Sequence, residues 1–121
     1  MMNVAKEIFE ANRDILIRIK KEKVEVSYIK EDDVLLISIG AHKITPLSFE
    51  IADDYIVVHY NPKTYEIVGF TLPYVKEYLK WHAKQMEGKK EIEDFEKIKD
   101  RQMIDTVTSN SISGLNNCAY A

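Results

Sequence analysis

Three histidines, His42, His59 and His82, have the widest chemical use in this chain, because imidazole can bind a metal ion or transfer a proton. A histidine metal site needs ligands at short, characteristic spacings. The separations here are 17 and 23 positions, and no cysteine or His-x-x-x-His pair accompanies them. We therefore expect packed or surface histidines and predict no metal ion and no cofactor.

Two pairs of adjacent aspartates, Asp32-Asp33 and Asp53-Asp54, could hold a divalent cation or serve as an acid and a base. Neighbouring residues of an extended chain point to opposite sides, so the two carboxylates of a pair do not converge easily on one atom. Both pairs also lie where the hydrophobic pattern requires a turn. The pattern favours two acidic turns.

Motifs of catalysis are missing from the sequence. The four glycines are too isolated to form a phosphate-binding loop, and no serine stands in a Gly-x-Ser-x-Gly context. Cys118 is the only cysteine and lies in a polar stretch, so no internal disulfide can form. We predict no catalytic residue. One alternative stays open, a small enzyme or ligand-binding domain with a site near His59 and Tyr60.

Aromatic residues concentrate between positions 55 and 81, where seven of the twelve in the chain occur. Tyr and Trp are favoured at protein interfaces, although most of these rings suit a core between a sheet and a helix. Trp81 lies off the apolar stripe of its predicted helix, which makes it the ring most available to a partner. The predicted partner-binding residues are Trp81, Tyr78, Asp53 and Asp54.

The net charge of −3 conceals an acidic middle, because residues 24–72 hold eight acids and three bases. An acidic surface repels phosphates, so this stretch argues against nucleic acid as a partner and suits a basic protein. No apolar run approaches the ~20 residues of a membrane-spanning helix, and no secretory signal is predicted. We expect a soluble, cytoplasmic protein with no membrane partner.

The elements that would position these side chains follow from the hydrophobic periodicity. A spacing near 3.6 predicts one amphipathic helix from Asn3, a good N-cap, to Lys21. Alternation with a period of two predicts strands at residues 24–30, 34–39, 44–51, 55–60 and 65–72. Pro46 lacks a backbone N–H, which places the third strand at an edge. Gly69 indicates a bulge or a close approach of two backbones.

The C-terminal part begins at Pro73, which suits the first turn of a helix that ends near Gly88. Residues 89–103 are a second helical candidate with a thin apolar stripe. From residue 104 the composition changes to Ser, Thr and Asn, which predicts a disordered tail over 104–121.

The expected fold class is α+β, because short hairpin connections favour antiparallel pairing and nothing resembles a βαβ crossover. The architecture is an N-terminal helix, an antiparallel β-meander of four to five strands, and one or two C-terminal helices. It forms a single domain over residues 1–103, with its sheet core at 24–72.

A longer pattern combines Tyr28, the acidic turn before Val34-Leu35-Leu36-Ile37, the strand Ile56-Val57-Val58, and the polar turn and return strand 61–70. It resembles the small domain-of-unknown-function family 2283 over about 45 residues, from Val26 to Phe70. The resemblance implies a β-meander and brings no catalytic residues. Some members look like the second partner in toxin–antitoxin-like gene pairs, which implies a binding role.

The leading functional hypothesis is a non-enzymatic protein-binding module, in one version the antitoxin-like partner of a small toxin. It would contact a protein partner, or a second copy as a homodimer, through a strand edge or the Trp81 helix.

Overall fold

The computed structural model describes residues 3–40, 43–51, 55–81 and 101–120, without the side chains of 79–81, 101 and 102. In this part the helices are α1 (Val4–Ala11), α2 (Ile15–Lys21), α3 (Val75–Trp81) and α5 (Arg101–Ala119). The strands are β1 (Val24–Ile29), β2 (Val34–Ile39), β3 (Leu47–Ile51), β4 (Ile56–Tyr60) and β5 (Ile67–Leu72). The predicted helix at 89–103 lies mostly outside the described residues.

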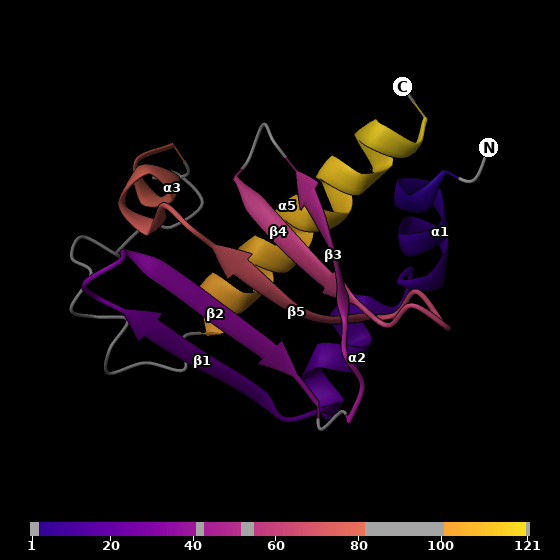
Figure 1. Ribbon diagram of the computed structural model, residues 1–121, viewed down its shortest axis with the longest axis horizontal. Coiled ribbons are helices and arrows are strands. Elements are labelled where there is room, and N and C mark those ends of the chain that lie inside the picture. Colours follow the sequence, from indigo (N-terminus) through magenta and orange to yellow (C-terminus); the bar gives the residue numbers. More distant parts are fainter. Residues whose placement is uncertain (1–2, 41–42, 52–54, 82–100, 121) are drawn as a thin grey trace.

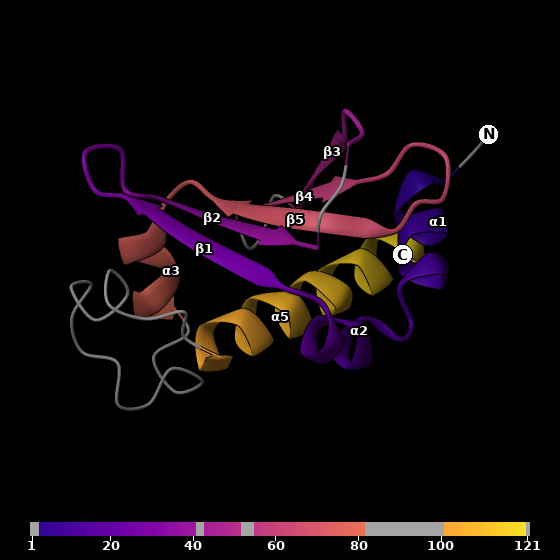
Figure 2. The ribbon, with the colours of Figure 1, turned by 90° about the horizontal axis from the view of Figure 1, so that it is seen from below.

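The described elements form two layers, a sheet and a set of helices (Figure 1). Figure 2 shows α2, α3 and α5 on one side of the sheet, with α5 running beneath the strands and α1 beside the end of the sheet. α5 contacts α1, α2 and β3. The core lies between the layers and includes Leu35, Ile37, Val58, Phe70 and Leu72, all at most 3% exposed.

The sheet has the strand order β1-β2-β5-β4-β3, and every pair of neighbours is antiparallel. A β1–β2 hairpin and a β3–β4–β5 meander are joined by the pairing of β2 with β5. The predicted α+β fold with an antiparallel, meander-like sheet is therefore confirmed. β3, which follows Pro46, lies at an edge as expected.

The N-terminal segment is broken into two helices where the sequence predicts one. Asn3 caps α1 as expected, since its side chain accepts a hydrogen bond from the backbone N–H of Lys6. α1 then ends at Ala11, and α2 begins at Ile15. The cause of the break is Asn12, whose side chain bonds a carbonyl of α1 and two backbone groups at and just before the start of β5.

Asn12 is 0% exposed. Its Nδ2 donates to the carbonyl oxygens of Ile8, at 2.6 Å, and Tyr65, at 2.9 Å, while its Oδ1 accepts from the N–H of Ile67 at 2.8 Å. One side chain thus ties the helix break to the turn between β4 and β5. The apolar spacing of the helix carries no trace of this contact.

The prediction of a disordered tail over 104–121 is wrong. α5 covers Arg101–Ala119, and its apolar face is buried in the core through Met103, Ile104, Val107 and Leu115. Two of its polar residues, Thr108 and Ser111, are also 0% exposed. The last helix is therefore a central part of the helix layer.

The polar composition of α5 predicted disorder, but its buried hydroxyls find hydrogen-bond partners within the helix itself. Thr108 Oγ1 donates to the carbonyl of Ile104, and Ser111 Oγ donates to that of Val107, each at 2.7 Å. A serine or threonine that bonds one turn back hides its polarity, so it can be buried at little cost. Composition alone does not show that burial.

The acidic turn Asp32-Asp33 is confirmed and has a second role. Asp33 has a positive φ of 54° and lies between β1 and β2. Its Oδ1 accepts from the Tyr28 hydroxyl at 2.7 Å, its Oδ2 from the N–H of Lys76 at 3.2 Å, and its carbonyl from the N–H of Val75 at 3.2 Å. Asp33 therefore satisfies N–H groups at the start of α3, a distant helix.

Candidate functional site

No described helix covers the face of the sheet opposite α2, α3 and α5 (Figure 2). We call it the open face. The strand registers place two rows of residues across it. One row is Ser48, His59, Gly69 and Ser38, and the next is Glu50, Val57, Thr71 and Leu36. β3 rises above the neighbouring strands in Figure 2, so the open face has a wall on one side.

Gly69 forms a hollow in the middle of the open face. A β-carbon built on Gly69 would lie 2.6 Å from the carbonyl oxygen of Ile37, so only glycine allows this close approach. The register shift beside it makes Val68 the extra residue of a bulge. Both readings of Gly69 from the sequence are thus confirmed. The hollow measures about 160 Å³, and its rim includes Leu36 and Pro46.

His59 stands beside the hollow between two hydroxyl groups. Its Nδ1 lies 3.0 Å from Ser48 Oγ, and its Nε2 lies 2.6 Å from Thr71 Oγ1. Burial lowers the pKa of His59 below its usual range, so the ring is neutral at pH 7. One ring nitrogen then donates and the other accepts. The two hydroxyls fix the orientation of the ring.

A serine beside a histidine is one half of a nucleophilic site, but attack on a carbonyl also needs donors aimed at the developing oxyanion. The backbone around His59 belongs to β4, which pairs with β3 on one side and β5 on the other. Its N–H groups are committed to these ladders. Within the described residues, this row is better suited to surface contact than to acyl transfer.

His59 and Tyr60 do not form a common site. Alternation along β4 puts His59 on the open face and Tyr60 on the helix side, where it is only 6% exposed. The Tyr60 ring stacks on Tyr65, with the ring centroids 5.8 Å apart. A ligand on the open face could therefore reach His59 but not Tyr60.

Of the four predicted partner-binding residues, only Tyr78 has a described side chain. Tyr78 is 2% exposed, and its hydroxyl accepts a hydrogen bond from Asn110 Nδ2 at 2.7 Å, so it packs α3 against α5. Trp81 is the last residue of α3, and its side chain is outside the described part. Asp53 and Asp54 also lie outside it, as do His42 and His82.

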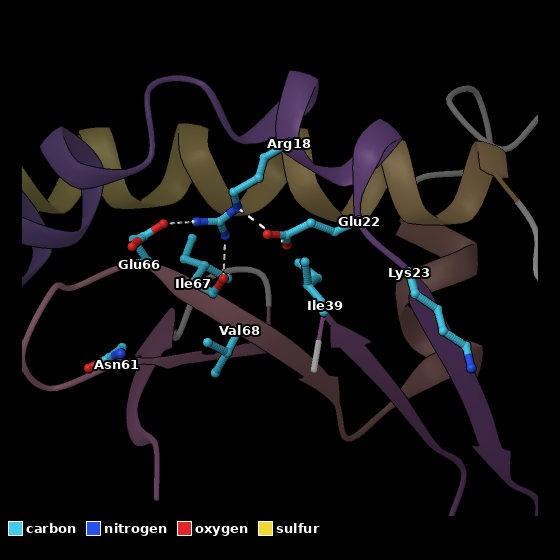
Figure 3. A pocket seen from close by; sticks show the side chains of 9 residues that line it. Arg18, Glu22, Lys23, Ile39, Asn61, Glu66, Ile67 and Val68 are labelled. Carbon is cyan, nitrogen blue, oxygen red and sulfur yellow. Dashed lines mark hydrogen bonds and ion pairs between the residues drawn. The ribbon is translucent and has the colours of Figure 1, made fainter. Parts of the chain in front are cut away.

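A second hollow, of about 300 Å³, lies near Arg18 of α2 (Figure 3). Arg18 donates to Glu66 at 2.8 Å and to the carbonyl of Ile67, and its Nε lies 3.8 Å from Glu22. Figure 3 shows the guanidinium directed at these groups. Its side chain is only 13% exposed. Because two carboxylates flank it, Arg18 serves to join α2 to the start of β5 and offers little charge to an anionic ligand.

The described residues contain no cluster of three or more His, Cys, Asp or Glu that could hold a metal ion. None of their helices combines the length and the apolarity that crossing a membrane requires.

Comparison with known proteins gives no relative for this chain. No protein-family model, no curated protein and no solved structure matches it.

The strand pattern left the exposure of Leu36 on the open face unpredicted. β2 is apolar at five of its six positions, which predicts burial on both faces. In the structure Leu36 is 39% exposed while Leu35 and Ile37 are buried. The signal that could have revealed it is the small number of predicted helices, too few to cover both faces of a five-stranded sheet.

Proposed function

We propose that this protein is a non-enzymatic binding module that receives a partner protein on the open face. The observation that carries the proposal is the exposed Leu36 beside the hollow at Gly69, on a sheet whose other side is covered by α2, α3 and α5. An apolar hollow with a polar rim is the usual form of a protein contact site.

The charges around the open face indicate the chemistry of the partner. Glu25 on β1 and Glu50 on β3 are exposed and point to the open side at opposite margins. Glu25 shares its charge with Lys23, whose Nζ lies 3.1 Å from its Oε1, so Glu50 is the stronger acidic margin. A complementary partner presents an aliphatic side chain for the hollow and Lys or Arg side chains for the two glutamates. Two open faces packed on each other would offer these glutamates no basic strand residue, because the described rows that cross the face contain no Lys or Arg.

Two leucine substitutions test the proposal. Leu36→Glu puts a charge in the hollow, whereas Leu47→Glu makes the same change at a 50% exposed leucine on the helix side of the sheet. We expect wild type and Leu47→Glu to retain the same protein from a native lysate, and Leu36→Glu to lose it. Retention measured by affinity capture and mass spectrometry should also weaken as salt rises.

Identical capture by all three proteins would contradict the proposal. The identity of the captured protein tests a narrower version, the antitoxin-like role that the family resemblance implies. Only a small toxin supports that version.

A second candidate is a small ligand bound in the hollow. The observation that favours it is the neutral His59, held between Ser48 and Thr71 with both ring nitrogens near hydroxyls. In that case Leu36→Glu would abolish binding of a small molecule while the set of captured proteins stayed the same.

A further inference from the structure

α2 carries an apolar patch that faces away from its own core. Leu16 is 46% exposed and Ile17 is 60% exposed, while Ile15 and Ile19 of the same helix are buried at 1% and 0%. Adjacent exposed aliphatic side chains on a short helix leave apolar surface in water, which a partner can remove. Ile17 is the most exposed aliphatic side chain among the described residues.

Basic side chains surround this patch. Arg13, Lys20 and Lys21 are exposed around it, and Asp14 is the acid between them. Arg13 is also bonded to Glu10, which leaves the two lysines as the main free positive charges beside the patch. The outer face of α2 therefore combines aliphatic residues with flanking lysines, which is the composition expected of a partner for the open face.

We propose that the open face takes as its partner a second copy of this chain, whose α2 places Leu16 and Ile17 against the hollow at Gly69. This inference rests on the proposed function. Lys20 and Lys21 of one copy then lie near the acidic margins of the other, where Glu50 is exposed and Glu25 is shared with Lys23. The charge signs favour this contact over the packing of two open faces, whose described strand residues supply no Lys or Arg to these glutamates.

The contact is head to tail, because the two surfaces belong to different sides of the molecule. Figure 2 shows α2 in the helix layer and the open face on the other side of the sheet. In a pair, one copy thus keeps an unused α2 surface and the other keeps an unused open face, so a third copy can add to either end. α2 has only seven residues, so the contact is small and the association weak.

The experiment uses two charge substitutions, one in each surface. Ile17→Glu disables the helix surface and leaves the open face intact, while Leu36→Glu does the reverse. Both side chains are exposed, so the fold should persist, which circular dichroism checks. Leu47→Glu is the matched control on the sheet. Molecular mass is followed by light scattering and analytical ultracentrifugation up to about 1 mM protein, the range for a small interface.

We expect wild type and Leu47→Glu to grow past a dimer as concentration rises. Each of the other two variants alone should stay monomeric, with association weakened at least about tenfold. A mixture of Ile17→Glu and Leu36→Glu should form a one-to-one dimer and stop there, because only one productive contact remains. The mixture is the decisive sample, since misfolded variants would not restore association.

Three results would overturn the inference. They are a wild-type monomer at every concentration, association of Ile17→Glu alone, which indicates contact between open faces, and association of Leu36→Glu alone, which indicates contact between helices. The proposed function is judged separately by lysate capture. A monomeric wild type whose captured protein is lost in Leu36→Glu and kept in Ile17→Glu rejects the second copy but retains the open face as a binding site.

Discussion

Asn12 shows how one polar side chain can end a helix and join two distant segments. It is completely buried, yet its donor and acceptor groups are used by the backbone of Ile8, Tyr65 and Ile67. Buried polar groups with partners cost little, whereas the same backbone groups without them are expensive. The Asn12 side chain therefore contributes more to the stability of the fold than a side chain of its size usually does.

Replacing Asn12 by Ala should lower the free energy of unfolding by about 3 kcal/mol, since three buried backbone groups lose their partner. Asn12→Asp should also be destabilising, because it keeps the acceptor for Ile67 but loses both donors and buries a charge. Urea denaturation measures both. The control is Asn116→Ala at an exposed position of α5, with an expected change within about 0.5 kcal/mol. A loss below about 1 kcal/mol in Asn12→Ala would show that water replaces these bonds.

At the scale of the elements, the strands were predictable from sequence and the last helix was not. Strand prediction succeeded because alternation of polar and apolar residues directly reflects which face is buried. It held for β1, where Glu25 and Ser27 alternate with Val24 and Val26. The prediction failed for α5 because the buried face of this helix mixes Thr108 and Ser111 with aliphatic residues.

The pairing of β2 with β5 and the open face also lay beyond the sequence. Periodicity states which residues share a face but not which strands are neighbours or which face a helix covers. His59 illustrates the limit, because its position on a strand was predicted while its contacts with Ser48 and Thr71 depend on the strand register. Tyr78 was expected at a surface and is buried under α5.

The contribution of α5 to stability can be measured by comparing alanine substitutions of two leucines, one buried and one exposed. Leu115 is 0% exposed in α5, and Leu16 is 46% exposed in α2. Leu115→Ala should cost about 2–5 kcal/mol of unfolding free energy, the usual range for a buried leucine. Leu16→Ala should cost about 0.5 kcal/mol or less. Thermal and urea denaturation compare them, and equal stabilities would mean that the residues after 104 do not contribute to the core.

At the scale of the whole molecule, the first and last described helices pack together. Asn3 Nδ2 donates to the carbonyl of Ala119 at 3.1 Å, and the Tyr120 hydroxyl donates to Glu10. The hydrogen bond from Tyr120, followed by that from Arg13, lowers the pKa of the Glu10 carboxyl. Residues 3 and 120 are therefore near neighbours, although most of the chain lies between them.

This proximity predicts that the chain tolerates circular permutation. A short Gly/Ser linker from residue 120 to residue 3, with new termini between the exposed Glu31 and Asp32, should preserve the sheet and the helix layer. Far-ultraviolet circular dichroism and a single cooperative unfolding transition would show this. A second permutant opened between Phe70 and Thr71, inside β5, should fail to fold. Failure of the first permutant would mean that the β1–β2 turn is needed intact.

Because α5 is late in the sequence, the core can be completed only near the end of synthesis. A ribosome releases the strands first, and the apolar inner face of the sheet must wait for residues 101–119 to emerge. At typical synthesis rates, the 43 positions from Leu72 to Leu115 take about 2 to 9 seconds. During that interval the part of the inner face that α5 covers stays exposed, which is the kind of apolar surface that promotes aggregation of a nascent chain.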